Sequence, residues 1–323
     1  MKALYWNGKK AEVRDVPAST PAAGEALVRV EVAGVCRTDV EIAKGYMGFE
    51  GVMGHEFCGV VEECPKGDWK GKRVVGEINL PCRTCSYCKA GLERHCPYRT
   101  VLGIAGKSGA FAEYLTIPVE NLHAVPENIG PETAVFTEPV AACFEILEQT
   151  DVEGKSVAVL GDGKLGILAA RVLSNAGPRS LVLVGKHRRK LELVKPDKID
   201  AKLIVEFLSE AREPEKKLDI VVEATGRPEG FRAALNSVRP RGVIVQKTTV
   251  AGKVEIDLSR VVVDEVTVIG SRCGPFPPAI EALSSGSVRV DDLVTSAFPL
   301  ERADEALREA SQRGILKVLV DMR

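Results

Sequence analysis

Residues 156–173 read Ser-Val-Ala-Val-Leu-Gly-Asp-Gly-Lys-Leu-Gly-Ile-Leu-Ala-Ala-Arg-Val-Leu, and this stretch decides the fold of the middle of the chain. An apolar run typical of a buried strand ends at Leu160, a G-x-G-x-x-G turn follows, and an apolar helix begins at about Lys164. A second apolar run, Leu181–Val184, comes within the roughly 30 residues that a βαβ unit occupies. The stretch therefore predicts a dinucleotide-binding turn rather than an ordinary strand–helix connection.

Each glycine of this turn has a separate expected use. Gly161 permits the tight turn, Gly163 lets the backbone approach a pyrophosphate, and Gly166 lets the helix pack closely on the strand. The helix N-terminus at Lys164 and Leu165 directs unpaired N–H groups at the phosphates. We therefore place all five residues in a cofactor site.

Further apolar runs alternate with helical patterns after this turn. Such near-continuous Val, Ile and Leu runs predict a parallel sheet covered on both faces. The expected strands are 219–223, 242–246 and 266–269, with a helix at 231–238 and another strand and helix within 190–217.

The flanking sequence is richer in short strands broken by Gly and Pro. The expected elements there are strands 26–32, 74–75, 112–116 and 316–320, and a helix at 131–149 interrupted by Pro139. The chain therefore reads as a β-rich domain of residues 1–140 and 271–323 with an α/β domain of residues 141–270 inserted into it.

Composition excludes several classes of function. The 323 residues are 45% hydrophobic and 28% charged, with a formal net charge of −1, as in a soluble globular protein. The single basic run, Lys186–Lys190, makes a poor nucleic-acid surface, so we expect no nucleic-acid partner. No apolar stretch reaches bilayer length and the first residues turn polar too early for a secretory signal, so we expect a cytoplasmic protein without a membrane partner.

Four of the nine cysteines form the most specific pattern in the sequence. They are Cys82, Cys85, Cys88 and Cys96. Thiolates at this spacing can enclose one ion in a tetrahedron with no open position, which predicts a structural zinc lobe at about residues 82–96. The alternatives are an iron–sulfur cluster or free thiols, and His95 could replace Cys96 as the fourth ligand.

Three shorter motifs suggest a second metal site. They are Cys36-Arg-Thr-Asp39, Gly54-His-Glu56 and Thr137-Glu-Pro139. Each is unremarkable alone, but together they offer one thiolate, one imidazole and the carboxylates of two glutamates, with room for a water. That is the incomplete ligand set of a catalytic zinc, so we expect two zinc ions per chain.

The order of these motifs resembles the zinc-dependent medium-chain dehydrogenase/reductase superfamily of alcohol, polyol and sugar dehydrogenases. The resemblance also includes Glu223-Ala-Thr-Gly226 and the closing strand, and it covers essentially the whole chain. It implies an α/β protein in which a GroES-like β-rich catalytic domain is split around a Rossmann doubly wound parallel-sheet cofactor domain. It further implies hydride transfer between an alcohol, polyol or sugar hydroxyl, or the matching carbonyl, and a nicotinamide cofactor, in a homodimer or homotetramer.

The resemblance also implies roles for individual residues in the catalytic site. Cys36 and His55 correspond to zinc ligands, and Glu138 and Glu56 to carboxylates that bind the metal directly or exchange with water. Thr38 resembles the hydroxyl that passes on the substrate proton, and Asp39 the group that holds the second nitrogen of His55.

Other positions resemble cofactor contacts. Arg37 and Lys317 correspond to contacts with the cofactor phosphates, and Thr225 falls in the cofactor site. The sequence departs from the alcohol dehydrogenases at Glu41, where these enzymes often complete a proton relay with histidine.

The end of the second Rossmann strand indicates which nicotinamide cofactor is used. A carboxylate there would hold the ribose 2′-hydroxyl, but this chain has Gly185, and no carboxylate follows until Glu192. Glycine should leave room for a 2′-phosphate, and Lys186, His187 and Arg188 can pair with it. We therefore predict NADP(H) over NAD(H); the alternative is a solvated basic helix start.

Two other functions compete with this interpretation. A zinc-free, quinone-reductase-like member of the superfamily would leave Cys36, His55 and the cysteine lobe without a use. A non-catalytic zinc- or nucleotide-binding protein would leave the set Cys36, His55 and Glu138 unexplained. The substrate itself is not readable, because Tyr46, Phe49 and Phe276 could line a pocket or simply pack in the core.

Overall fold

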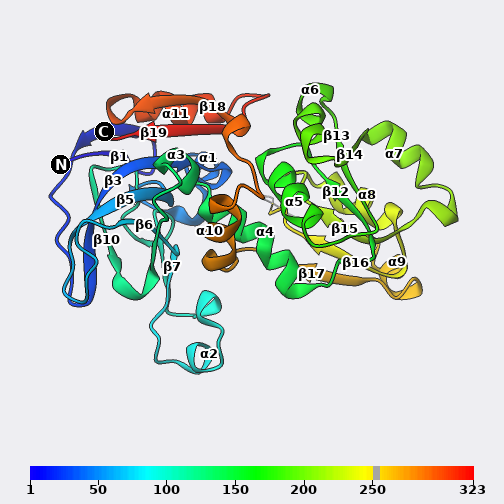
Figure 1. Ribbon diagram of the computed structural model, residues 1–323, viewed down its shortest axis with the longest axis horizontal. Coiled ribbons are helices and arrows are strands. Elements are labelled where there is room, and N and C mark those ends of the chain that lie inside the picture. The colour runs from blue at the N-terminus through cyan, green and yellow to red at the C-terminus, as the bar shows by residue number, and fades with distance from the viewer. Residues whose placement is uncertain (250–254) are drawn as a thin grey trace. The chain divides into compact units, whose positions relative to one another are not determined.

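The computed structural model describes residues 1–249 and 255–323 as two compact units (Figure 1). Unit 1 comprises residues 1–138, 279–284 and 290–323, and unit 2 comprises residues 139–278 and 285–289. The first division lies two residues before the predicted boundary at 140/141, and the chain leaves unit 2 at residue 278 rather than at 270. Among the described residues, no helix is both long and apolar enough to cross a bilayer.

Unit 1 is built around a seven-stranded sheet whose main path runs β11-β6-β5-β3-β19-β18, with β10 also paired to β3. Its central strand β3 alternates half-buried and buried side chains over residues 25–30, as a strand with one covered face should, and is buried at every residue from 31 to 35. The strands of this sheet are β3 (Glu25–Val35), β5 (Glu56–Glu63), β6 (Arg73–Gly76), β10 (Tyr114–Pro118), β11 (Leu122–Ala124), β18 (Val294–Pro299) and β19 (Lys317–Asp321).

Two small sheets and several short helices complete unit 1. The sheets have the orders β2-β1-β4 and β7-β8-β9. Their strands are β1 (Lys2–Trp6), β2 (Ala11–Asp15), β4 (Gly51–Val52), β7 (Asn79–Leu80), β8 (Thr100–Leu102) and β9 (Gly106–Lys107), and the helices are α1 (Arg37–Ile42), α2 (Ser86–Lys89), α3 (Pro131–Ala134) and α11 (Ala303–Ala310).

Unit 2 is a six-stranded parallel sheet in the order β14-β13-β12-β15-β16-β17, the doubly wound order 3-2-1-4-5-6. Its strands are β12 (Ser156–Leu160), β13 (Ser180–Gly185), β14 (Asp200–Leu203), β15 (Leu218–Glu223), β16 (Val238–Gln246) and β17 (Thr267–Gly270). Its helices are α5 (Lys164–Ser174), α6 (Arg188–Leu191), α7 (Ile204–Glu210), α8 (Glu229–Ser237) and α9 (Leu258–Val263). Two helices, α4 (Thr137–Gln149) and α10 (Phe276–Ser284), cross the unit boundaries, and the first two residues of α4 belong to unit 1.

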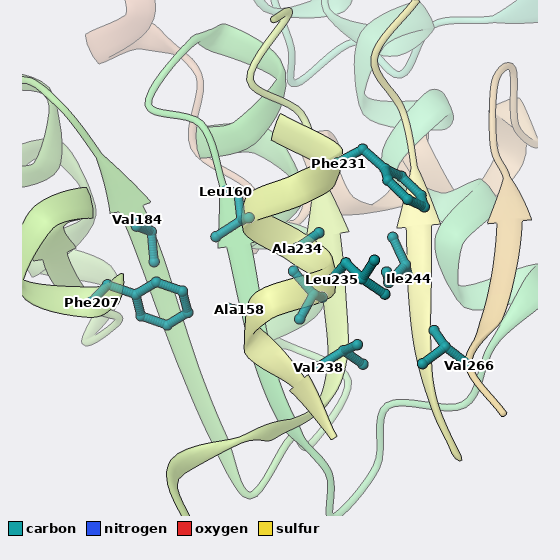
Figure 2. Close-up of a cluster of buried hydrophobic side chains, with 11 residues drawn as sticks. Ala158, Leu160, Val184, Phe207, Phe231, Ala234, Leu235, Val238, Ile244 and Val266 are labelled. Atoms are coloured by element: carbon teal, nitrogen blue, oxygen red, sulfur yellow. The ribbon is translucent and has the colours of Figure 1, made fainter. Parts of the chain in front are cut away.

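The core under α8 shows why this layered arrangement is stable. Phe231, Ala234 and Leu235 share one face of the helix at the i, i+3, i+4 spacing and lie against the sheet (Figure 2). The strands below contribute buried aliphatic side chains, among them Ala158 and Ile244. Burial of such side chains contributes about 1.5–3 kcal/mol each before conformational entropy is subtracted.

Most predicted elements are present with shifted ends. The strand predicted at 112–116 begins at Tyr114, and the segment 190–217 contains β14 and α7 as expected. The predicted long helix is two helices, α3 and α4, separated at residues 135–136 rather than at Pro139. Pro139 lies in the first turn of α4, where backbone N–H groups have no helical acceptor and proline costs little.

Candidate active site and metal centres

The four lobe cysteines lie together in unit 1, and their sulfurs are arranged to hold one ion. Sγ–Sγ separations are 3.5 Å for Cys85–Cys88, 3.8 Å for Cys85–Cys96 and 3.5 Å for Cys82–Cys96. A tetrahedral ion with metal–sulfur bonds of about 2.3 Å has sulfur–sulfur edges of about 3.8 Å. The donor set therefore fits zinc.

Local backbone structure prepares this lobe for a metal. Hydrogen bonds from the backbone and the hydroxyl of Thr84 lower the pKa of the Cys82 thiol to about 6, whereas burial raises that of Cys88 to about 12. A cation is thus required to keep all four sulfurs ionised in one place. His95, the alternative ligand, is exposed and does not belong to the group.

A second group of possible ligands also lies in unit 1. Ligand atoms of Cys36, His55 and Glu56 are within 4.8 Å of one another. The register of the sheet explains why these three residues lie close together. Strands β3 and β5 are antiparallel with Gly34 opposite Glu56, so the residues after β3 lie beside those at the start of β5. Gly54, at φ +94°, lets the chain enter β5 beside Phe111, where a Cβ would clash with the ring.

Asp39 organises the two principal ligands. One of its carboxylate oxygens accepts the backbone N–H of Cys36 at 2.8 Å, and the other lies 3.2 Å from Nδ1 of His55. An imidazole held at Nδ1 presents Nε2 to a metal. Although burial alone would lower the pKa of His55, the charges of Asp39 and Cys36 raise it well above its usual value. Surroundings that favour positive charge this strongly suit a divalent cation.

Glu56 is paired with a lysine that the sequence suggested for another role. Lys317 Nζ forms an ion pair with Glu56 Oε2, and both side chains are fully buried. The ammonium also lies 5.3 Å from the centroid of the Phe136 ring, and burial lowers its pKa to about 8. A Cβ on Gly34 would collide with both partners, so glycine makes space for the pair. This environment differs from the predicted phosphate contact and favours a role beside the metal ligands.

The other predicted catalytic residues lie at different distances from this group. Thr38 Oγ1 is 3.8 Å from Cys36 Sγ, close enough to serve a substrate held there. Glu138, half-buried in the first turn of α4, is not a member of the ligand group among the described residues. Arg37 is exposed and pairs at 2.8 Å with Glu41, the residue at the relay position.

The predicted pocket residues divide between surface and core. Phe49 and Phe276 are buried, whereas Tyr46 is exposed. Burial in the core is therefore the better description of both phenylalanines.

The glycine turn of unit 2 has the geometry that dinucleotide binding requires. Gly161 has φ +124°, and a Cβ on Gly166 would collide with the carbonyl of Gly161, so α5 and the turn touch at backbone distance. A Cβ on Gly163 would meet no atom of the protein within 4 Å. Lys164 and Leu165 open the 11-residue helix α5 directly after it. The space beside Gly163 fits a pyrophosphate at a helix N-terminus.

The space beside Gly185 corrects one sequence-based expectation. Glycine at this strand end does not leave room for a phosphate, because a Cβ on Gly185 would collide with the side chain of Asp162. Lys186, His187 and Arg188 are exposed, and Arg188 Nη2 lies 3.5 Å from Glu206 Oε1. The basic run is therefore accessible, with a carboxylate beside it.

Thr225 belongs to a polar network at the end of β15. Its backbone N–H and hydroxyl both donate to Glu223 Oε1, at 2.8 and 2.5 Å, and Gln246 donates to the other carboxylate oxygen at 2.7 Å. Because Glu223 is fully buried, these bonds fix the backbone at the carboxyl edge of the sheet. Thr225 is a positioned part of that edge.

Sequence reasoning missed two features of these sites. One is Asp162, whose signal was an acidic residue inside the glycine turn together with a glycine at the next strand end. The other is the pairing of Lys317 with Glu56, which joins β19 to β5 across β3 and has no local signal in the sequence.

Comparison with known proteins gives consistent matches along the chain. The alcohol dehydrogenase GroES-like domain family matches residues 22–127, and the glucose dehydrogenase C-terminus family matches residues 132–322. A sorbitol dehydrogenase of Halalkalibacterium halodurans is 27% identical over 95% of this chain and 94% of its own.

Solved structures agree with these matches. A zinc-binding dehydrogenase of Sinorhizobium meliloti bound to NADP superposes with a TM-score of 0.90 at 26% identity, over 99% of this chain and 98% of that one. An alcohol dehydrogenase of Escherichia coli in complex with NADH gives a TM-score of 0.89 at 26% identity, over 100% and 99% of the chains. Neighbours of this fold thus include both NADP and NADH complexes.

Proposed function

Since this chain belongs to the zinc-dependent medium-chain dehydrogenase/reductase superfamily, we propose that its substrate is a polyol or sugar, oxidised at one hydroxyl to the carbonyl or formed by the reverse reduction. The chain is an oxidoreductase that transfers a hydride between such a small molecule and a nicotinamide cofactor. The observation that carries the proposal is the group of half-buried Cys36 with buried His55 and Glu56, an incomplete ligand set that would leave a coordination position for substrate. Likeness to sorbitol dehydrogenase supports the polyol class.

The side chains of unit 1 suggest how the reaction proceeds. Zinc held by Cys36 and His55 would supply a Lewis acid that lowers the pKa of a substrate hydroxyl. Asp39 holds Nδ1 of His55 and so fixes the tautomer that binds metal. The Thr38 hydroxyl, 3.8 Å from Cys36 Sγ, accepts the substrate proton and passes it on. Lys317 offsets the charge of Glu56 and keeps that carboxylate available as a further ligand.

Glu138 keeps a proposed place in this scheme. A carboxylate in the first turn of α4 can bind the metal through water, which needs a longer separation than direct ligation. Glu138→Ala should then weaken zinc binding at Cys36 and His55 more than at the cysteine lobe. Equal zinc content in the variant and the parent would exclude this role.

A substrate screen with metal analysis tests the proposed activity. Primary alcohols, secondary alcohols, polyols and aldoses would each be assayed with NAD⁺ and NADP⁺, and quinones with the reduced cofactors. We expect the highest kcat/KM for a polyol or sugar and loss of turnover on chelation. Full quinone reduction by metal-free protein would instead support a zinc-free reductase. Absence of turnover with every substrate would support a non-catalytic binding protein.

We further propose two zinc ions per chain, one in the cysteine lobe and one at Cys36, His55 and Glu56. The two described ligand groups support this number. Elemental analysis of active, fully loaded protein should give two zinc atoms per chain. One zinc or none in such protein, or iron in the lobe, would contradict the proposal.

The preference for NADP(H) over NAD(H) is a further part of the proposal. Two features of the structure act on this preference in opposite directions. Exposed Lys186 and Arg188 can pair with a 2′-phosphate, whereas Asp162 brings a negative charge beside Gly185. Charge-assisted bonds of about 1.5–3 kcal/mol each lead us to expect at least a tenfold bias in kcat/KM toward NADP⁺.

Paired substitution tests the role of the basic run. Lys186→Ala with Arg188→Ala should raise KM for NADP⁺ and leave NAD⁺ kinetics nearly unchanged. Lys195→Ala, which removes an exposed lysine paired with Glu192, serves as the matched control. Equal or better use of NAD⁺ by the parent protein would contradict the preference.

We also propose that the chain forms a homodimer or higher homo-oligomer through the β17 edge of unit 2. Within residues 1–249 and 255–323, β17 ends the sheet order, and Leu258, Val262 and Val263 of α9 and Val268 of β17 are exposed. An edge strand presents free N–H and C=O groups that an identical antiparallel strand can complete, so a second copy is the fitting partner. Val262→Lys should shift the mass measured by light scattering toward the monomer, whereas Val205→Lys, at an exposed position of α7, should not.

A cytoplasmic location is the final part of the proposal. The four thiols of the cysteine lobe and the thiol of Cys36 can act as metal ligands only when they are reduced, and the cytosol keeps thiols reduced. Cell fractionation with activity measurement would test it, and recovery in a secreted fraction would contradict it.

A further inference from the structure

The carboxylate of Asp162 lies at the carboxyl end of β13, although its residue belongs to the turn between β12 and α5. Its Oδ2 accepts the backbone N–H groups of Lys186 at 2.8 Å and His187 at 2.7 Å, and lies 2.9 Å from Nδ1 of His187. These are the first residues after the strand. A residue from the glycine turn therefore holds the chain at the point where the second Rossmann strand ends.

Gly185 is glycine because of this carboxylate. Its φ is outside the left-handed region, so its backbone would accept a side chain. The obstacle is space: an added Cβ would collide with Cβ of Asp162 and approach its Oδ2 to 2.6 Å. The side chain that ordinarily emerges from this strand end and the side chain of Asp162 thus compete for one volume. The chain keeps the acidic group and supplies it from another element.

In a doubly wound sheet, a carboxylate at the end of the second strand lies beside the adenosine ribose of a bound dinucleotide. There it accepts a hydrogen bond from the ribose 2′-hydroxyl and disfavours a 2′-phosphate. In the described part of the chain, the contacts of Asp162 are made by Oδ2, which leaves Oδ1 to accept from a ligand. The side chain is 12% exposed, so a bound molecule can reach it.

We infer that Asp162 is a specificity-determining residue that supplies the missing strand-end carboxylate, binds the ribose 2′-hydroxyl of NAD(H) and opposes the 2′-phosphate of NADP(H). This inference rests on the proposed cofactor site at Gly161–Gly166. It makes cofactor choice a balance between two groups of opposite charge, Asp162 on one side and Lys186 with Arg188 on the other. The sequence at the strand end shows only the second group.

The charge of Asp162 can be removed while its shape is kept. Asp162→Asn retains an oxygen that can accept the two backbone N–H groups, and its amide can donate to a phosphate. We expect the ratio of dissociation constants, Kd for NAD⁺ over Kd for NADP⁺, to rise about tenfold in the zinc-loaded protein, the effect of one charge-assisted contact. The fragments 5′-AMP and 2′,5′-ADP should show the same shift, which separates binding from turnover. Glu192→Gln, an exposed carboxylate paired with Lys195, is the charge-matched control and should leave the ratio unchanged.

A positional swap tests the shared volume independently. Gly185→Asp alone should lower the melting temperature, because both side chains then need the same space. Gly185→Asp combined with Asp162→Ala returns the carboxylate to the strand and should restore both the melting temperature and NAD⁺ binding. A double variant no more stable than Gly185→Asp alone would show that the two side chains do not compete and would overturn this part of the inference.

The outcomes distinguish the inference from the function on which it rests. An unchanged or lowered Kd ratio in Asp162→Asn would overturn the inference and reduce Asp162 to a backbone anchor. A parent protein that prefers NAD⁺, with a ratio that still rises tenfold in the variant, would refute the NADP preference and support the inference. Failure of the parent to bind either dinucleotide would refute both.

Discussion

The two ligand groups of unit 1 differ in how far along the chain their members lie. The lobe takes four sulfurs from one segment, Cys82–Cys96, and short turns within that segment place them. The second group takes Cys36 from directly after β3, and His55 and Glu56 from the start of β5. It also depends on Asp39 and Lys317 from two further elements. One group is local, and the other exists only when the sheet has formed.

The two groups also differ in the chemistry of their ligands. The lobe is all sulfur, and backbone and hydroxyl hydrogen bonds adjust its thiols. The second group mixes a thiol, an imidazole and a carboxylate with a charged partner for each of the latter two. A closed set of four sulfurs suits structure, and a mixed, incomplete set suits catalysis. Substitutions should therefore affect stability at the first group and turnover at the second.

The largest effect should follow removal of a lobe ligand. Cys85→Ala leaves three sulfurs, and structural zinc contributes apparent folding free energy on the order of 10 kcal/mol. We expect a much lower melting temperature, measured by calorimetry, and a lower yield of soluble protein. Elemental analysis should show the loss of one zinc ion per chain. Cys64→Ala, a free cysteine outside both groups, is the control. An equal loss of stability in the control would show that the effect is not specific to a ligand of the lobe and would contradict the structural role of the lobe.

Removal of His55 should have the opposite profile. His55→Ala eliminates a ligand of the second group, so turnover should fall below detection while circular dichroism and lobe zinc stay near those of the parent. His123→Ala replaces a histidine that lies 3.2 Å from Glu77 and is not a member of either ligand group, and this variant should remain active. Retained turnover in His55→Ala would show that the second group is not catalytic.

A smaller change should follow loss of the buried lysine. Lys317→Met leaves Glu56 buried without its cation, and breaking a buried pair costs about 3–5 kcal/mol. Added zinc would compensate part of that charge, so the zinc-induced rise in melting temperature should exceed the rise in the parent. Lys317→Arg should behave more like the parent. An identical zinc-induced rise in all three proteins would separate Lys317 from the metal site.

The smallest of these effects concerns the proton path. Thr38→Ala should reduce kcat by roughly 10²-fold, the usual scale for a positioned proton-transfer group, without loss of zinc. Thr38→Ser keeps the hydroxyl and should recover most of the rate. Similar rates in the alanine and serine variants would mean that Thr38 has no part in proton transfer.

The candidate sites were predictable from the sequence where their residues are neighbours along the chain. Cys82–Cys96 and Gly161–Gly166 carry their chemistry in short motifs, and the structure brings each set together. Cys36 and His55 lie farther apart; scattered motifs suggested a metal site there, and the resemblance to a family implied their individual roles. The structure places them in one group with Glu56 and leaves Glu138 outside it.

Two predictions failed where a contact was not local. The space at Gly185 was expected to be open, but Asp162 fills it from the preceding turn. Lys317 was expected to contact a phosphate, but it is buried against Glu56. In both cases a charged side chain found a partner on another element, and no spacing along the sequence records such a pair.

The sequence by itself determined the alternation of strand and helix, the glycine turn and the cysteine lobe, because backbone periodicity and ligand spacing act over a few residues. Only the tertiary structure decided which buried charges meet. Asp162 with the end of β13, Asp39 with His55, and Glu56 with Lys317 each pair groups from separate elements. A buried charge must find a partner within a few ångströms, and the fold alone decides which residues lie within that distance.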